Sequence, residues 1–105
     1  MCLFLIIIFL ATSAAIALKP ESYILYYNRG YVNEVMKKND LAIKDYSKSI
    51  NMYAKFYSTY ANRGILYYKN KQYDLAIQDF DKSIVIEPKN PGGYYNRAMV
   101  YQQRA

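Results

Sequence analysis

The stretch YYNRG at residues 26–30, followed by DLAIKDYSKSI at residues 40–50, returns as YANRG at residues 60–64 and DLAIQDFDKSI at residues 74–84. Each position i of the first copy thus aligns with position i+34, and 13 of the 28 pairs between residues 26–53 and residues 60–87 are identical. The register continues once more with YYNR at residues 94–97. Self-similarity at a fixed period of this length is typical of a repeat array, so we expect stacked units and no single central core.

The spacing of apolar and small residues predicts two helices in each unit. In the second unit, Tyr60, Gly64 and Tyr67 fall at i, i+4 and i+7, on one face of a first helix. Ala76 and Phe80 begin the same pattern on a second helix. We expect Gly64 and Ala76 to let the two helices approach closely, with Tyr67 and Phe80 filling the space beside them.

The predicted breaks fall where a two-helix unit needs them. The polar stretches 37–39 and 70–72 separate the first helix of each unit from the second. Pro88 stops a second helix because it cannot continue the hydrogen-bond ladder, whereas Pro91 suits the first turn of the helix that follows.

Charged residues recur in the same register. The arginines Arg29, Arg63 and Arg97 are predicted to pair with a carboxylate of a nearby helix, their stems covering apolar surface. The carboxylates of the second helices lie at i+3 or i+4 spacing from a lysine, which predicts weak pairs on a solvated face. These pairs are Asp40 with Lys44, Asp45 with Lys48 and Asp79 with Lys82.

These motifs resemble a known family. Tyr-x-Asn-Arg-Gly, then Asp-Leu-Ala-Ile-x-Asp-Tyr/Phe-x-Lys-Ser-Ile and a closing Glu-Pro, in this i+34 register, are similar to the tetratricopeptide repeat. The resemblance implies an all-α fold, an alpha-alpha superhelix in which antiparallel helix pairs form a short solenoid. We expect an N-terminal hydrophobic segment at residues 1–18, repeats at 22–55 and 56–89, and the first helix of a third repeat at 90–105.

On the same resemblance, the first helices line a groove for a peptide or a partner helix. Aromatic and Met side chains supply contact area, and amides pair with an extended backbone. The predicted groove residues are Tyr27, Asn28, Tyr31, Asn62, Ile65, Tyr68, Lys69, Tyr95, Asn96 and Met99. Packing between neighbouring first helices is the alternative for the tyrosines, and hydrogen bonding within the repeat is the alternative for the asparagines.

One family function is testable from the residues. Repeats that bind acidic C-terminal tails of chaperones use a clamp of Lys, Asn and Arg, and the matching positions here are Tyr27, Tyr31, Asn62, Gly92 and Asn96. Only Asn62 fits that clamp, so we expect weak or no binding to an acidic tail peptide.

The N-terminal segment leaves three interpretations open, because residues 1–18 contain no Asp, Glu, Lys or Arg. An apolar run followed by Ala15-Ile16-Ala17 resembles a secretory signal with its cleavage site. Eighteen uncharged residues at about 1.5 Å each approach the thickness of a bilayer, which predicts a signal anchor. Alternatively, residues 15–20 match the register of residues 83–88, as in the second helix of an upstream repeat. The first two predict association with membranes or the secretory pathway through residues 3–18, and the third a cytoplasmic protein.

Composition excludes several classes of site. The 105 residues include no His and a single Cys, so a His-containing metal site, a His-based catalytic triad and an internal disulfide are ruled out. We expect no enzyme, no metal and no cofactor. The net charge of +6 permits an anionic partner, but the lysines scatter over turns and outer faces, so nucleic-acid binding is not favoured.

The leading hypothesis is therefore a scaffold that binds a protein or peptide of unknown identity. The alternative is a piece of a longer solenoid. In that case Tyr94, Ala98 and Tyr101 would form an apolar stripe on the last helix that self-associates or packs on further repeats.

Overall fold

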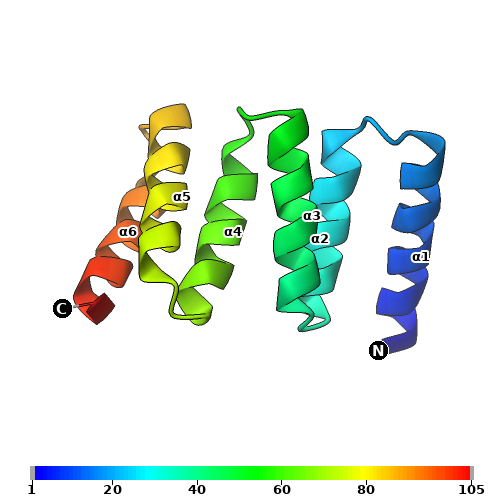
Figure 1. Ribbon diagram of the computed structural model, residues 1–105, viewed down its shortest axis with the longest axis horizontal. Helices are drawn as coiled ribbons and strands as arrows, with labels where there is room; N and C mark the ends of the chain where they lie inside the picture. The colour runs from blue at the N-terminus through cyan, green and yellow to red at the C-terminus, as the bar shows by residue number, and fades with distance from the viewer. Residues whose placement is uncertain (1, 105) are drawn as a thin grey trace. The chain divides into compact units, whose positions relative to one another are not determined.

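The computed structural model describes residues 2–104, and these form six α-helices with no strand (Figure 1). The predicted all-α fold of antiparallel helix pairs is confirmed. The chain divides into two compact units, Met1–Ala54 and Lys55–Ala105. Met1 and Ala105, which end the predicted segments 1–18 and 90–105, lie outside the described residues.

Unit 1 contains α1 (Cys2–Leu18), α2 (Tyr23–Val35) and α3 (Asn39–Met52). Helices α2 and α3 form the tightest pair, and α1 packs against α2. Gly30 of α2 faces Tyr46 of α3, and a Cβ atom added at Gly30 would lie 2.7 Å from the Tyr46 ring. This close approach explains why glycine occupies the middle of a helix, where it lowers helix propensity by about 1 kcal/mol.

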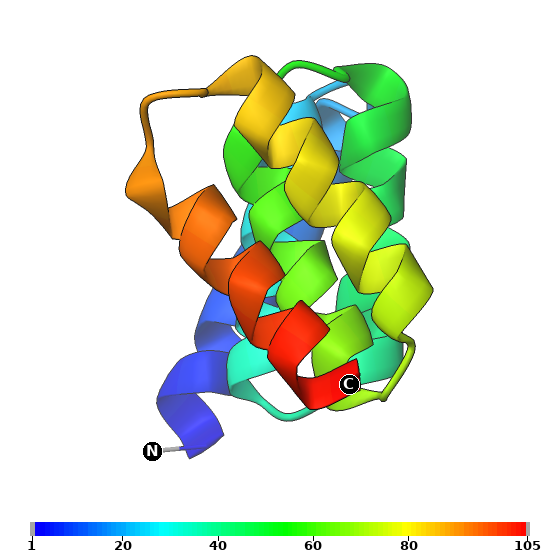
Figure 2. The ribbon, with the colours of Figure 1, turned by 90° about the vertical axis from the view of Figure 1, so that its left-hand side faces the viewer.

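Unit 2 contains α4 (Tyr57–Lys69), α5 (Tyr73–Ile86) and α6 (Pro91–Arg104). Ala76, Phe80 and Val100, all fully buried, form a core cluster of this unit. A Cβ atom added at Gly64 would lie 2.7 Å from the Phe80 ring, which confirms the predicted close approach. Helix α6 lies alongside α5 and also contacts α4 (Figure 2).

The turn between the two helices of each pair has the same geometry. Lys37 and Lys71 follow their helices with positive φ values of 64° and 62°. The Lys71 amide donates to the Tyr68 carbonyl at 2.9 Å, and the Gln72 amide donates to the Tyr67 carbonyl at 2.9 Å. This pattern is a Schellman motif, in which glycine is usually the left-handed residue. The break predicted at residues 70–72 is thus confirmed, and the one predicted at 37–39 lies at residues 36–38, because Asn39 already begins α3.

One set of core residues was not predicted from the sequence. Val32, Leu66 and Val100 are buried, and they recur in the i+34 register of the repeat. Val32 and Leu66 are different residues, and Val100 lies beyond the aligned residues 60–87. Identical pairs alone therefore do not reveal these positions. They could have been found as apolar residues that recur every 34 positions, without the requirement that the residues be identical.

Helix α1 covers 17 residues and carries no charged side chain. Ile16 is its buried residue, and the Thr12 hydroxyl donates to the Ile8 carbonyl at 2.8 Å. Among residues 2–104, none of the helices combines the length and the apolar character required to cross a bilayer.

Candidate functional site

The predicted groove residues of unit 1 lie on α2. Asn28 and Tyr31 are exposed, and Tyr31 keeps 53% of its surface accessible. Tyr27 is half-buried, and its ring centroid lies 5.8 Å from that of Tyr46 on α3. Unit 1 therefore offers one aromatic and one amide side chain to solvent, while Tyr27 also serves packing within the unit.

The predicted residues of α4 divide in a similar way. Ile65 and Tyr68 are half-buried and pack against the core of unit 2, and the Tyr68 ring lies 5.8 Å from Tyr73. Asn62 is half-buried and already interacts within the chain, whereas Lys69 is exposed. The alternative of packing within the repeat thus applies in part to Ile65 and Tyr68.

Helix α6 carries the most exposed aromatic residue of the predicted groove. Tyr95 is 71% exposed, and Asn96 and Met99 are its neighbours on the same helix. Because α4 and α6 are in contact, the predicted residues of these two helices belong to one unit. In the described part of the chain, Asn28 and Asn96 form no side-chain hydrogen bond; Asn28 is exposed, whereas Asn96 and Met99 are half-buried.

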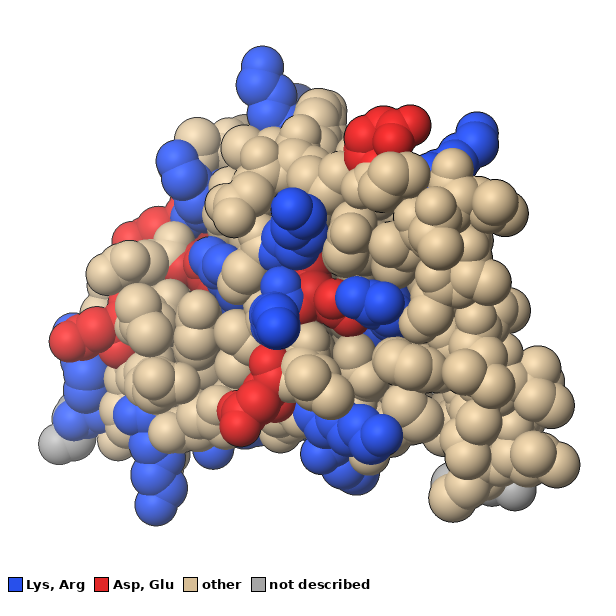
Figure 3. All heavy atoms as spheres, turned by 45° about the vertical axis from the view of Figure 1, so that its right-hand side comes forward, with Lys and Arg blue, Asp and Glu red and all other residues tan. Residues whose placement is uncertain are grey.

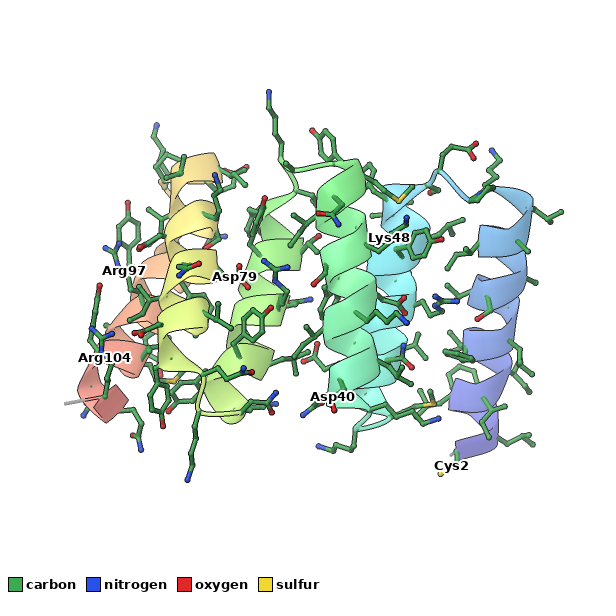
Figure 4. The ribbon with its side chains drawn as sticks, viewed as in Figure 1. Cys2, Asp40, Lys48, Asp79, Arg97 and Arg104 are labelled. Atoms are coloured by element: carbon green, nitrogen blue, oxygen red, sulfur yellow. The ribbon has the colours of Figure 1, made fainter. Side chains whose placement is uncertain are left out.

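The arginine prediction is confirmed, and the prediction of a solvated face is wrong for Asp45 and Asp79, although Asp40 is exposed. Arg29 donates two hydrogen bonds to the Asp45 carboxylate, from Nε at 2.8 Å and from Nη2 at 2.9 Å. Arg63 donates to Asp79 in the same way, with both distances 2.8 Å. Asp45 and Asp79 are buried and do not belong to a solvated face with Lys48 and Lys82. Figure 4 shows Asp79 pointing from α5 toward α4. The equal i to i+16 spacing from Arg to Asp in both units was the signal for these pairs.

Burial sets the electrostatics of the pair in unit 2. Burial raises the pKa of the Asp79 carboxyl above its ordinary value, and the hydrogen bond and charge of Arg63 offset this only in part. Burial alone would lower the pKa of the Arg63 guanidinium, but the hydrogen bond and charge of Asp79 raise it overall. The pair therefore holds two helices together at the cost of desolvating both charges.

The ion pairs of α6 are more exposed. Arg97 contacts Asp81 of α5 at 2.8 Å, and Arg104 contacts Asp74 of α5 at 2.6 Å. Figure 4 shows both arginines on α6. Each guanidinium lies over a tyrosine of its own helix: Arg97 is 5.7 Å from the Tyr94 ring centroid. Exposed pairs of this kind contribute little stability.

The predicted stripe on α6 is accessible. Tyr94 and Tyr101 are 43% and 47% exposed. The Tyr94 hydroxyl donates to the Pro88 carbonyl at 2.9 Å. Self-association through this stripe, which includes Ala98, stays a prediction. Within residues 2–104, no group of three or more His, Cys, Asp or Glu side chains is arranged to hold a metal ion.

Two family models match the chain in tandem. Both describe the tetratricopeptide repeat, one over residues 23–56 and the other over residues 57–90. Each matched segment begins one residue after the repeat predicted from the sequence. A search of the curated proteins found no match.

Solved structures share the fold. The crystal structure of MamA superposes with a TM-score of 0.88 at 22% identity, covering 91% of this chain and 56% of MamA. The chain thus spans about half the length of the MamA structures. The first TPR of Spaghetti (RPAP3) bound to the HSP90 peptide SRMEEVD gives 0.87 at 18% identity, covering 90% of this chain and 75% of that one. The Arabidopsis OM64 TPR domain gives 0.84 at 23% identity, covering 88% and 76%. At these identities the likeness shows the fold, a helical-repeat superhelix.

Proposed function

Because the chain belongs to the tetratricopeptide-repeat family, we propose that it is a protein-interaction module whose first helices bind an extended peptide or a partner helix. The observation that carries this proposal is the exposure of Tyr31, Asn28 and Tyr95 on first helices whose neighbouring residues form the cores of the two units. Tyr31 and Tyr95 remain 53% and 71% exposed, and neither is needed to close the core of its unit. Exposed tyrosines of this kind are typical anchors of protein interfaces.

The amides supply the polar part of the proposed contact. Asn28 and Asn96 have no side-chain hydrogen bond within the described residues, and each can donate to and accept from a peptide backbone. Two structural neighbours carry peptides, the HSP90 peptide SRMEEVD and the HSP70 peptide SGPTIEEVD. In the present chain only Asn62 fits the clamp, so we expect it to prefer peptides without an acidic C-terminal tail.

The test is a selection of peptides from a random displayed library on the full chain, followed by calorimetric titration of the enriched peptides. We expect Tyr95→Ala and Asn96→Ala to weaken binding by about tenfold each, equivalent to about 1.4 kcal/mol. Val85→Ala is the matched control, because Val85 is 75% exposed on the second helix α5 of the same unit.

Helicity by circular dichroism must be unchanged in all three variants. The proposal fails if no peptide is enriched, or if the enriched peptides bind the Tyr95 and Asn96 variants as tightly as they bind the Val85 variant. Titration of SRMEEVD itself checks the predicted absence of a clamp, and micromolar affinity would contradict it.

A further inference from the structure

The outer surface of α1 is an apolar feature that the interaction function leaves unexplained. Leu3, Phe4, Ile7, Leu10 and Leu18 are between 56% and 84% exposed. Their spacing places them along one side of the helix. Figure 3 shows this surface as a continuous area without charged side chains. Exposed apolar patches of this extent mark interaction sites.

The inner side of α1 is already occupied by unit 1. Ile16 is buried, and the Ser13 hydroxyl accepts a hydrogen bond from Arg29 Nη1 at 3.4 Å. The Arg29 guanidinium carbon also lies 6.0 Å from the Phe9 ring centroid. Since Thr12 bonds to its own helix, both hydroxyl side chains of α1 are satisfied and none is left for the outer side.

This lack of polar groups favours lipid as the occupant over a protein. Protein interfaces carry several hydrogen bonds, whereas the exposed side chains on the outer side of α1, between the flanking lysines, offer no hydrogen-bonding group. Acyl chains need no hydrogen bonds, and the helix satisfies its own backbone groups.

Lysines flank the apolar surface at both ends. Lys19 directly follows α1. Lys37 and Lys38 lie beside the first turns of α1, where they line a hollow of about 400 Å³ together with Leu5, Ile6 and Met36. Lysine stems lie along apolar surface while the ammonium groups reach the phosphates of a membrane. Two exposed acidic residues oppose this attraction, Glu21 near Lys19 and Asp40 near Lys38.

We propose that the outer side of α1, with its inner side still packed on α2, lies in the boundary between the headgroups and acyl chains of a membrane containing anionic phospholipids. Lys19, Lys37 and Lys38 then contact lipid phosphates. The proposal is independent of the peptide-binding helices, so either function can fail without the other.

The test is flotation of the full chain with vesicles of phosphatidylcholine, either alone or mixed two to one with phosphatidylserine. We expect binding to the mixed vesicles and weaker binding to the neutral ones. The double variant Phe4→Gln with Ile7→Gln should reduce partitioning by about tenfold or more, because it removes apolar contact without touching the inner side. Val85→Gln, an equally exposed apolar position on α5, is its control.

The double variant Lys19→Gln with Lys38→Gln should reduce binding to the mixed vesicles by about fivefold for each lysine. Its control, Lys71→Gln with Lys89→Gln, removes the same charge from exposed sites of unit 2. The proposal is overturned if the wild-type chain does not float, if the α1 variant floats equally well, or if both lysine variants behave alike. Dimerisation in lipid-free sedimentation that depends on Phe4 and Ile7, without flotation, would identify a second copy as the occupant instead.

Discussion

Units 1 and 2 build the same bidentate ion pair but surround it with different chemistry. In unit 1, Asp45 Oδ2 accepts from Arg29 and also from Asn33 Nδ2 at 3.0 Å. Asn33 is only 2% exposed, and its Oδ1 has no hydrogen-bond partner among the described residues. In unit 2 the position of Asn33 is taken by Tyr67, whose ring centroid lies 5.5 Å from the Arg63 guanidinium.

The second helices, α3 and α5, also differ in that unit 1 carries the additional polar group. The Tyr46 hydroxyl of unit 1 donates to Glu34 Oε1 at 2.7 Å, whereas unit 2 has Phe80 at this position. Glycine, arginine and aspartate are thus identical in both units, whereas unit 2 replaces the amide of Asn33 by the Tyr67 ring and lacks the hydroxyl of Tyr46. The shared residues set the helix approach, and the neighbours decide how well each buried charge is satisfied.

The largest loss of folding stability should follow removal of Arg63, the arginine of the buried ion pair in unit 2. Arg63→Met keeps much of the apolar stem but leaves Asp79 buried without its cation, so we expect a loss of about 2–4 kcal/mol in the free energy of unfolding at neutral pH. Arg29→Met should cost less, because Asn33 still donates to Asp45. Urea unfolding of the full chain measures both.

The loss in the Arg63 variant should depend on pH. A carboxyl whose pKa is higher in the folded chain than in the unfolded chain binds its proton more tightly when folded. Burial already raises the pKa of Asp79, and removal of Arg63 raises it further. The variant should therefore recover stability as the pH falls toward the ordinary carboxyl value of 3.8 and lose it as the pH rises.

Arg97→Met is the control for this series, because the Asp81 side chain is 50% exposed and can remain hydrated. It should cost less than about 1 kcal/mol. Equal losses at Arg29, Arg63 and Arg97 would show that burial does not distinguish the three pairs.

The next largest loss of stability should come from the glycines at which two helices approach closely. Gly64→Ala places a methyl group 2.7 Å from the fully buried Phe80 ring, so we expect a net loss of about 1–3 kcal/mol despite the better helix propensity of Ala. Gly30→Ala should cost more, because the Tyr46 ring is held by Glu34 and the Ala42 carbonyl lies 3.3 Å from the added atom. Thermal unfolding monitored by circular dichroism measures the order.

Gly92→Ala is the matched control. The added atom would meet only the Asn90 side-chain oxygen, at 3.1 Å, and that side chain can move. A loss at Gly92 as large as that at Gly64 would show that propensity and not contact governs these positions.

The repeat period predicted the fold, the helix breaks and the contact between Gly64 and Phe80, because all three depend on local pattern and on side-chain size. The burial of Asp45 and Asp79 was not predicted. Their spacing to Lys48 and Lys82 satisfies the rule for surface pairs, and that rule considers one helix at a time. The true partners lie on the neighbouring helix across a turn, so the pairing depends on how two helices face each other. The exposure of Tyr95 against the packing of Tyr68 has the same origin, since both depend on which neighbouring helix covers them.

The smallest change in stability should come from the left-handed turn residues Lys37 and Lys71, and it should be identical in the two units. Lys71 adopts a left-handed conformation with φ of 62°, which disfavours any residue with a Cβ atom. Lys71→Gly removes that strain and retains the amide that donates to the Tyr68 carbonyl, although glycine also increases the entropy of the unfolded chain. We therefore expect a net gain of about 0.5 kcal/mol in the free energy of unfolding. Lys37→Gly should give the same gain, because its φ is 64° and its turn has the same two hydrogen bonds. Lys71→Ala, which keeps the Cβ atom, should give none. A gain in one unit alone would show that the turns, like the buried pairs, depend on the residues that surround them.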